Sequence, residues 1–230
     1  MRQLGAKTGL LAARQSVLFT EAALVASGVH ERLARPVGQL LGRWSTVWQA
    51  RRDAEDAITR ANARVAWADL RFDGAVLAFA NELLRDAGGQ SEDALFRSFF
   101  PEAPSRVVKL GLASQLTRCE DFAVIAAKRK LSAGAAKALR AVDDAMQAGR
   151  EALAVRKAAY VQQAEAALDA QSWREAAESA RQSVYVQLQS WALENRQSRA
   201  YAENFFPSGG ARSVGPAEEE PEPAPRPAGG

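Results

Sequence analysis

The stretch PVGQLLGRWSTVWQARRDAEDAITRANARVAWADLRFDGAVLAFANELLRD, residues 36–86, decides the fold of this 230-residue chain. Apolar or small side chains recur in it at alternating intervals of three and four residues, and the larger ones lie at seven-residue intervals that only Arg51 interrupts. The larger ones are Val37, Trp44, Ile58, Val65, Phe72 and Phe79, and a second row consists of Ala54, Ala61, Ala68 and Ala75. This pattern is typical of a long helix that packs closely against another helix. It predicts antiparallel pairing of long helices.

Glycine and proline place the ends of this helix and of the one before it. Pro36 suits the first turn of a helix, and Gly88 with Gly89 suits its end. Upstream, residues 10–27 read as a separate helix with Gly28 as its stop. Downstream, residues 91–100 read as a short amphipathic turn or helix that the prolines at 101 and 104 terminate.

The second half of the chain predicts helices over residues 107–127 and from an N-cap at Ser132 onward. Residues 168–172 (LDAQS) are expected to break the second of these helices, since Ser172 and Glu175 have the spacing of a capping box. Residues 160–193 resemble the helix-turn-helix of tetratricopeptide-repeat and HEPN-type domains. The resemblance implies a helical hairpin near residue 170. It implies no site residues, because the HEPN ribonuclease motif, an Arg followed by a His, is absent.

Two Phe-Phe-Pro tripeptides, at residues 99–101 and 205–207, each close a long Ala-rich stretch. They predict an internal duplication, with a first helical unit at 1–106 and a second, related unit at 107–207 packed on the first. Residues 208–230 are rich in Pro and Glu and are expected to be a disordered tail. The predicted fold is all-α, an elongated antiparallel helical bundle of two related long-helix units.

Composition restricts the classes of protein to which the chain can belong. It is 47% hydrophobic and 25% charged, as in ordinary globular domains, and its net charge is +3. The single cysteine, Cys119, permits no internal disulfide and is expected to be a small buried residue. Arg14 and Glu21 interrupt the apolar N-terminal run, so neither a secretory signal nor a transmembrane segment is predicted. We expect a cytoplasmic protein.

The chemistry of known helical enzymes is largely missing from the sequence. His30 is the only histidine, which excludes di-iron bundles and His-rich metal sites within one chain, and we expect it at a helix end or on the surface. Three carboxylate pairs have the helical spacing that Mg²⁺ enzymes use, and we interpret them as solvated faces: Asp69/Asp73, Glu165/Asp169 and Glu175/Glu178. We therefore predict no enzyme activity, no catalytic or metal-binding residues and no cofactor, although a carboxylate-metal enzyme stays open.

Basic side chains cluster in the middle of the chain. Lys128, Arg129 and Lys130, followed by Lys137 and Arg140, are candidates for contact with phosphates or other anions. Aromatic residues that could stack on single-stranded nucleic acid are lacking around them. Nucleic acid or an anionic surface is therefore the alternative partner.

The leading hypothesis is a non-enzymatic structural or protein–protein interaction protein, a scaffold or assembly factor that uses long Ala-rich helices and can self-associate. Phe99 and Phe100 are expected to be buried between units, and Phe205 and Phe206 to cap the folded body. All four are candidates for partner contact or unit packing.

Overall fold

The computed structural model describes residues 4, 8–198 and 200–207, and every regular element in this part of the chain is helical. The elements are α1 (Leu10–Ala26), α2 (Glu31–Asp86), α3 (Ala94–Phe99), α4 (Pro104–Val107), α5 (Leu112–Cys119), α6 (Phe122–Ala127), α7 (Ala133–Glu194) and the 3₁₀ helix η1 (Tyr201–Phe205). The all-α prediction is confirmed. Among the described helices, none has an apolar stretch of the length needed to cross a bilayer. The predicted tail, residues 208–230, lies outside the described residues.

The chain divides into two compact units. Unit 1 comprises Met1–Ser45 and Ser172–Gly230, and unit 2 comprises Thr46–Gln171. Each unit therefore combines segments from both halves of the sequence, and α2 and α7 contribute to both. This division differs from the sequence-based boundary at residues 106 and 107. The internal duplication stays a prediction.

Unit 1 packs α1 and η1 with the first part of α2 and the last part of α7. Leu10, Ala13, Val17 and Leu24 form the buried side of α1. Trp173 of α7 is buried, and its Nε1 donates a hydrogen bond to the carbonyl oxygen of Leu40 at 2.9 Å. A polar indole nitrogen is satisfied in this way without water.

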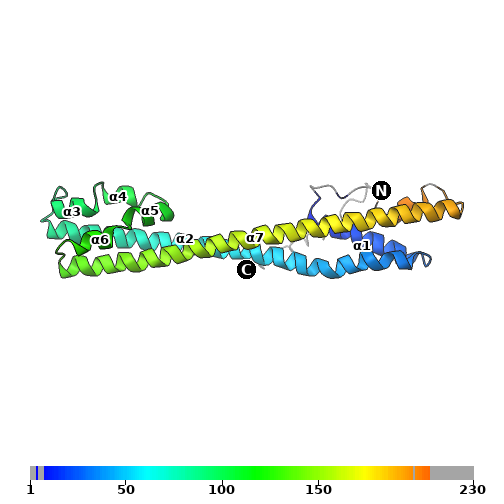
Figure 1. Ribbon diagram of the computed structural model, residues 1–230, viewed down its shortest axis with the longest axis horizontal. Helices are drawn as coiled ribbons and strands as arrows, with labels where there is room; N and C mark the ends of the chain where they lie inside the picture. Colours follow the sequence, from blue (N-terminus) through cyan, green and yellow to red (C-terminus); the bar gives the residue numbers. More distant parts are fainter. Residues whose placement is uncertain (1–3, 5–7, 199, 208–230) are drawn as a thin grey trace, which may run out of the picture. The chain divides into compact units, whose positions relative to one another are not determined.

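Unit 2 holds a larger core in which aromatic rings meet from three segments. The short helices α3 to α6 gather beside the end of α2 and the beginning of α7 (Figure 1). Phe79 of α2 lies at the centre, with its ring centroid 5.0 Å from that of Phe99, 6.1 Å from that of Phe100 and 5.8 Å from that of Phe122. Pro101 follows Phe100 directly, and α4 begins at Pro104, so the helix that carries Phe99 ends there.

Several predicted helix ends are confirmed. α1 ends just before Gly28, whose φ of 66° suits glycine, and α2 ends before Gly88 and Gly89, which also have positive φ. α7 begins after Ser132, whose Oγ accepts a hydrogen bond from the Ala135 amide at 3.1 Å. This is the expected N-cap.

The expected position of Pro36 in a first turn is wrong, because α2 begins five residues earlier, at Glu31. The Ser27 Oγ accepts a hydrogen bond from the His30 amide, so the turn before α2 already orients the first helical residues. Proline inside a helix removes a donor for the carbonyl four residues before it. That carbonyl belongs to Arg32, an exposed residue, where water can take the place of the missing amide.

Two further predictions need correction. Residues 107–127 hold the last residue of α4 and two short helices, α5 and α6, rather than one helix, because the chain turns at Gly111 and again at residues 120–121. The helical hairpin near residue 170 does not form, since α7 runs without a break from Ala133 to Glu194. Ala170 and Trp173 are both buried, and residues 168–172 contain neither Gly nor Pro, so packing holds this stretch helical despite the capping-box spacing.

Three of the four alanines in the predicted row of α2 are buried and Ala75 is partly buried, and α7 carries a matching row. Ala54, Ala61 and Ala68 of α2 are buried, and so are Ala145, Ala152, Ala159 and Ala166 of α7. All seven lie in unit 2. Rows of small residues allow two helices to approach closely.

Replacing Ala61 by Leu is therefore expected to destabilise unit 2 by about 1–3 kcal/mol, since a packed position has no room for three more carbon atoms. Ala78→Leu is the matched control, because Ala78 is an exposed residue of the same helix. Urea unfolding followed by circular dichroism measures both. Equal stability of the two variants would show that the helices do not approach closely at Ala61.

Candidate functional site

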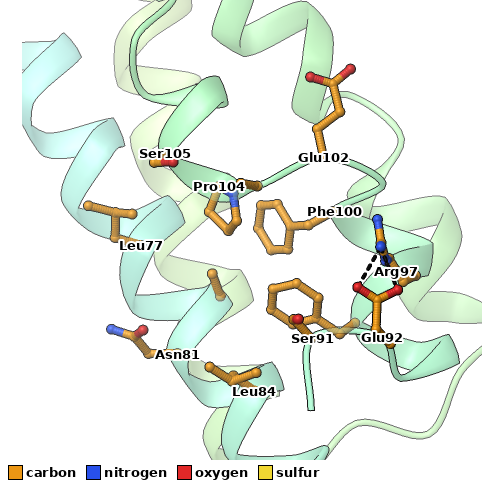
Figure 2. A pocket seen from close by; sticks show the side chains of 13 residues that line it. Leu77, Asn81, Leu84, Ser91, Glu92, Arg97, Phe100, Glu102, Pro104 and Ser105 are labelled. Atoms are coloured by element: carbon orange, nitrogen blue, oxygen red, sulfur yellow. Dashed lines mark hydrogen bonds and ion pairs between the residues drawn. The ribbon is translucent and has the colours of Figure 1, made fainter. Parts of the chain in front are cut away.

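A pocket of about 450 Å³ lies in unit 2 where α3 and the start of α4 face α2. Leu77, Asn81 and Leu84 line it from α2, and Phe100 and Pro104 face them from the other side (Figure 2). Its walls are mainly apolar. Such a pocket suits an apolar side chain or ligand group.

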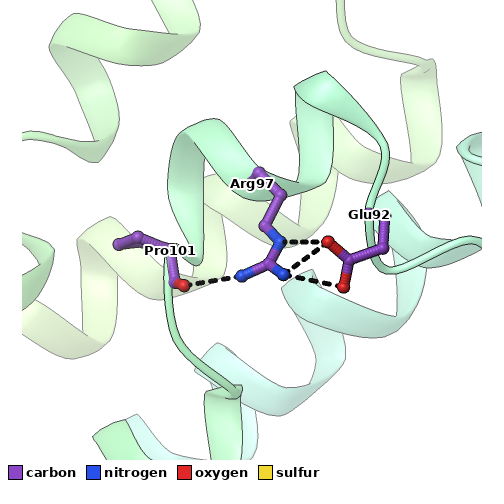
Figure 3. Close-up of polar contacts among 3 residues, drawn as sticks. All are labelled: Glu92, Arg97 and Pro101. Carbon is purple, nitrogen blue, oxygen red and sulfur yellow. Dashed lines mark hydrogen bonds and ion pairs between the residues drawn. The ribbon is translucent and has the colours of Figure 1, made fainter.

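The charged side chains at the rim of this pocket are paired with one another or with neighbours. Arg97 donates from Nη2 to Oε1 of Glu92 at 2.7 Å and from Nη1 to the carbonyl oxygen of Pro101 at 2.8 Å (Figure 3). Glu102 is 3.2 Å from a guanidinium nitrogen of Arg118. Because these charges are neutralised within the unit, the pocket offers no strong attraction to a charged group. Arg97 also fixes the backbone that follows the first Phe-Phe pair.

An exposed apolar row leads along α2 to the pocket. We call Trp67, Leu70, Gly74 and Leu77 the outer stripe, since they share one helical face at intervals of three and four residues. The exposed fractions of Trp67, Leu70 and Leu77 are 63%, 61% and 40%. Leu77 belongs to both the stripe and the pocket wall. The stripe and the pocket therefore form one surface, which is our candidate site.

A buried amide on α5 connects the α4–α5 loop to the part of α2 that carries this surface. Gln115 is fully buried, and its Nε2 donates to Oδ1 of Asp73 at 2.9 Å and to the carbonyl oxygen of Leu110 at 2.7 Å. Asp73 is the neighbour of Gly74, so this amide holds the loop beside the outer stripe. Burial raises the pKa of the Asp73 carboxyl above its ordinary value, and the hydrogen bond from Gln115 opposes that shift.

Basic side chains border the outer stripe on its other side. Arg64 and Arg71 lie seven residues apart, each three or four residues from members of the stripe, and both are exposed. The structure shows no ion pair for either of them among the residues it describes. Their charges are available to a partner.

The carboxylate pairs do not assemble into a metal site in the part of the chain that the structure describes, where no three His, Cys, Asp or Glu side chains converge. Glu165 and Asp169 are exposed on α7. Glu178 instead lies 3.1 Å from the buried Arg181. Cys119 is fully buried as predicted, and desolvation raises the pKa of its thiol to about 12, so it stays protonated at neutral pH.

His30 lies at a helix start, as predicted, but it is buried rather than on the surface, with 5% of its area exposed. Its ring packs edge-on against Trp191 with centroids 4.8 Å apart and also contacts Phe205. Its Nε2 is 3.0 Å from Oη of Tyr201. His30 thus ties η1 to the turn between α1 and α2 within unit 1.

Burial lowers the pKa of His30 below its ordinary value of 6.5. The unfolded chain then binds the proton more readily, so the stabilisation from neutral His30 is present above pH 6.5 and is lost as the pH falls through the lowered pKa. We expect the melting temperature of the wild-type protein to fall more between about pH 7.5 and about pH 5 than that of His30→Phe. Calorimetry at the two pH values tests this. Parallel decreases in both proteins would contradict it.

The predicted anion-contacting residues are all exposed. Lys128, Arg129 and Lys130 follow α6 directly, and Lys137 and Arg140 lie in the first turns of α7. The nearby Arg118 on α5 instead pairs with Glu102. Contact of these side chains with an anion stays a prediction.

Both Phe-Phe pairs are buried. Phe99 and Phe100 lie in the core of unit 2, whereas Phe205 and Phe206 close unit 1, where Phe206 packs against Tyr185 with ring centroids 5.6 Å apart. None of the four side chains is exposed, although Phe100 lines the wall of the pocket, and contact of any of them with a partner stays a prediction.

Comparisons with known protein families, curated proteins and solved structures find no match to this chain.

Sequence reasoning missed the outer stripe, although its signal was present. Trp67, Leu70 and Leu77 form a second seven-residue pattern on α2, offset from the buried one. Two apolar rows on one helix are typical either of burial on two sides or of one unpartnered face, and sequence cannot decide between these cases.

Proposed function

We propose that this chain is a non-enzymatic protein–protein interaction protein, a scaffold or assembly factor whose long helices pair antiparallel and whose outer helical faces bind partners or further copies. One observation carries the proposal: exposed large apolar side chains recur seven residues apart on three helices. They are Leu11, Leu18 and Val25 on α1, Leu70 and Leu77 on α2, and Val161 with Leu168 and Val186 with Leu193 on α7.

This spacing matters because isolated exposed apolar residues are normal, whereas rows of them are not. Residues seven apart lie on one face of a helix, which is the arrangement of a coiled-coil seam. The fold itself makes no use of these rows, since their side chains are exposed while a different row on each helix is buried. A partner helix would bury them.

Contacts within each unit support the antiparallel pairing. In unit 1 the early α2 residue Leu40 is hydrogen-bonded to Trp173, late in α7. In unit 2 the late α2 residue Glu82 lies against Gly134, at the start of α7. The alanine rows of the two helices then provide the close approach. A cytoplasmic location remains an expectation.

Site-specific photo-crosslinking in the native host tests the proposal. A photoreactive amino acid at position 18, 70 or 168 should give protein adducts of defined mass, and the same group at the exposed polar positions Asn62 and Glu151 should not. Light scattering on the purified full chain distinguishes adducts with another copy from adducts with a different protein. A strict monomer that forms no adduct at any of the three positions would refute the proposal.

A second candidate function is binding of nucleic acid or an anionic surface. The exposed basic residues Lys128, Arg129, Lys130, Lys137 and Arg140 favour it, because all five gather around the turn between α6 and α7. Binding through them should weaken with salt, with a log–log slope of about −0.9 for each phosphate contact. Salt-independent retention, or none, on DNA, RNA and anionic vesicles would eliminate this function.

A further inference from the structure

We propose that the outer stripe and the adjoining pocket bind an acidic amphipathic helix of a different protein, a deduction that rests on the proposed function and names the partner class for one of its surfaces. The partner helix would lay an apolar face along Trp67, Leu70 and Leu77, place one large apolar side chain in the pocket, and present carboxylates to Arg64 and Arg71.

The spacing along α2 argues for a helical partner. Beyond Leu77 the stripe continues into Asn81 and Leu84, which line the pocket, so residues 67, 70, 74, 77, 81 and 84 keep the three-four alternation of a and d positions. A helix follows such a row over its length, whereas an extended peptide has a period of two.

Gly74 gives this row a recess. A Cβ at residue 74 would have no heavy atom within 4 Å, so the fold does not need glycine there for space. Glycine inside a helix is nevertheless less stable than alanine. The recess between Leu70 and Leu77 suits a bulky partner side chain, in the way that a knob fits a hole.

The pocket supplies the anchor. It is apolar, it holds Phe100 and Leu84 in its wall, and the charged side chains at its rim are already paired. A large apolar side chain can enter without leaving a buried charge unpaired. Such anchor pockets provide much of the energy of helix-in-groove complexes.

The exposed arginines beside the outer stripe indicate the charge of the partner helix. In the heptad of the stripe, Arg64 and Arg71 occupy e positions, and both are exposed without an ion pair among the described residues. Carboxylates on the partner at the facing positions would pair with them, and lysines would be repelled. The partner is therefore acidic along its flank.

The same positions argue against a second copy of this chain. In an antiparallel pair of identical stripes, e positions face e positions, so arginine would meet arginine. In a parallel pair, Arg71 would face Ala66 and Arg64 would face Thr59, and neither carries a charge. Neither arrangement neutralises the two arginines.

Titration calorimetry with two synthetic peptides and the full-length protein tests the inference. Both peptides are about 24 residues long, which exceeds the length at which isolated helices are marginal, and both have leucine at a and d and alanine at b, c and f. One carries glutamate and the other lysine at e and g. We expect saturable binding of the glutamate peptide, at least about tenfold tighter than that of the lysine peptide.

Three variants test whether the outer stripe and its two arginines make the contacts with the peptide. Leu70→Ser should weaken binding of the glutamate peptide by about tenfold or more, whereas Leu168→Ser, at an equally exposed leucine on α7, should leave it unchanged. The double variant Arg64→Glu, Arg71→Glu should prefer the lysine peptide. Because all four substituted residues are exposed, circular dichroism should show folded proteins in each case.

Several outcomes would overturn the inference: no saturable binding of either peptide, equal affinity for both, an unchanged preference in the double arginine variant, or equal effects of the two serine variants. A dimer that Leu70→Ser dissociates would instead assign the stripe to a second copy. In each of these cases, crosslinked adducts at position 18 or 168 would still support the proposed function, so the two failures are distinguishable.

Discussion

Phe79→Ala is expected to destabilise unit 2 by about 3–5 kcal/mol, one of the two largest effects of any single substitution considered for this protein. Phe79 is fully buried and contacts the rings of Phe99, Phe100 and Phe122. Truncation removes the buried ring, its edge-on contact with Phe99, and the packing of neighbours drawn from two other segments. The cavity that remains cannot collapse easily, because long helices hold its walls.

Guanidinium unfolding monitored by circular dichroism measures the effect, with Leu77→Ala as the control two residues away. Leu77 is partly exposed, so its truncation should change the unfolding free energy by less than about 1 kcal/mol. If Phe79→Ala were as stable as Leu77→Ala, the aromatic cluster would not be the core of unit 2. The control also shows that a change in the outer stripe leaves the fold intact.

Glu178→Leu is expected to destabilise unit 1 by about 3–5 kcal/mol. Arg181 is only 1% exposed, and its Nη1 donates to Oε2 of Glu178 at 3.1 Å while its guanidinium lies over the ring of Phe206, 5.4 Å from the centroid. Glu178 also accepts a hydrogen bond from the Leu4 amide. Burial lowers the pKa of Arg181, and the nearby Glu178 carboxylate opposes this shift.

Removing the carboxylate therefore takes a nearby counter-ion away from a buried positive charge. Replacing both residues, as in Glu178→Leu with Arg181→Met, should recover most of the stability, because an apolar pair requires no compensation. Thermal unfolding of the two variants checks this, with Glu194→Leu, an exposed carboxylate of the same helix, as control. A double variant less stable than Glu178→Leu alone would show that Arg181 contributes in another way.

The candidate surface could be predicted only in part from the sequence. Leu70 and Leu77 belong to a readable seven-residue pattern, and Arg64 and Arg71 flank it. Their exposure, however, depends on where α3, α4 and α5 pack, and these helices begin at Ala94 or later in the chain. The pocket is harder to predict from the sequence, because its walls come from separate segments. These segments meet through Phe100 and through the contacts of Arg97 with Glu92 and Pro101.

The two prominent errors have local causes. The turn expected near residue 170 rested on the capping-box spacing of Ser172 and Glu175, a preference worth about 1 kcal/mol. Burial of Trp173 and its hydrogen bond to Leu40 outweigh that preference. Pro36 was expected to start a helix, but the turn at His30 begins the helix earlier and solvent can satisfy the carbonyl that the proline leaves free.

The sequence by itself determined the helical class, the ends of α1 and α2 at glycines, the N-cap of α7, and the buried alanine row. These features depend on backbone propensity and on periodicity, which are local properties. Tertiary structure decided which of two apolar rows on α2 is buried, that α7 continues past residue 170, and which side chains surround the two Phe-Phe pairs. The reason is that burial depends on contacts between residues far apart in the chain, such as Phe79 with Phe122 or Leu40 with Trp173. A local sequence pattern does not specify which distant residues will be in contact.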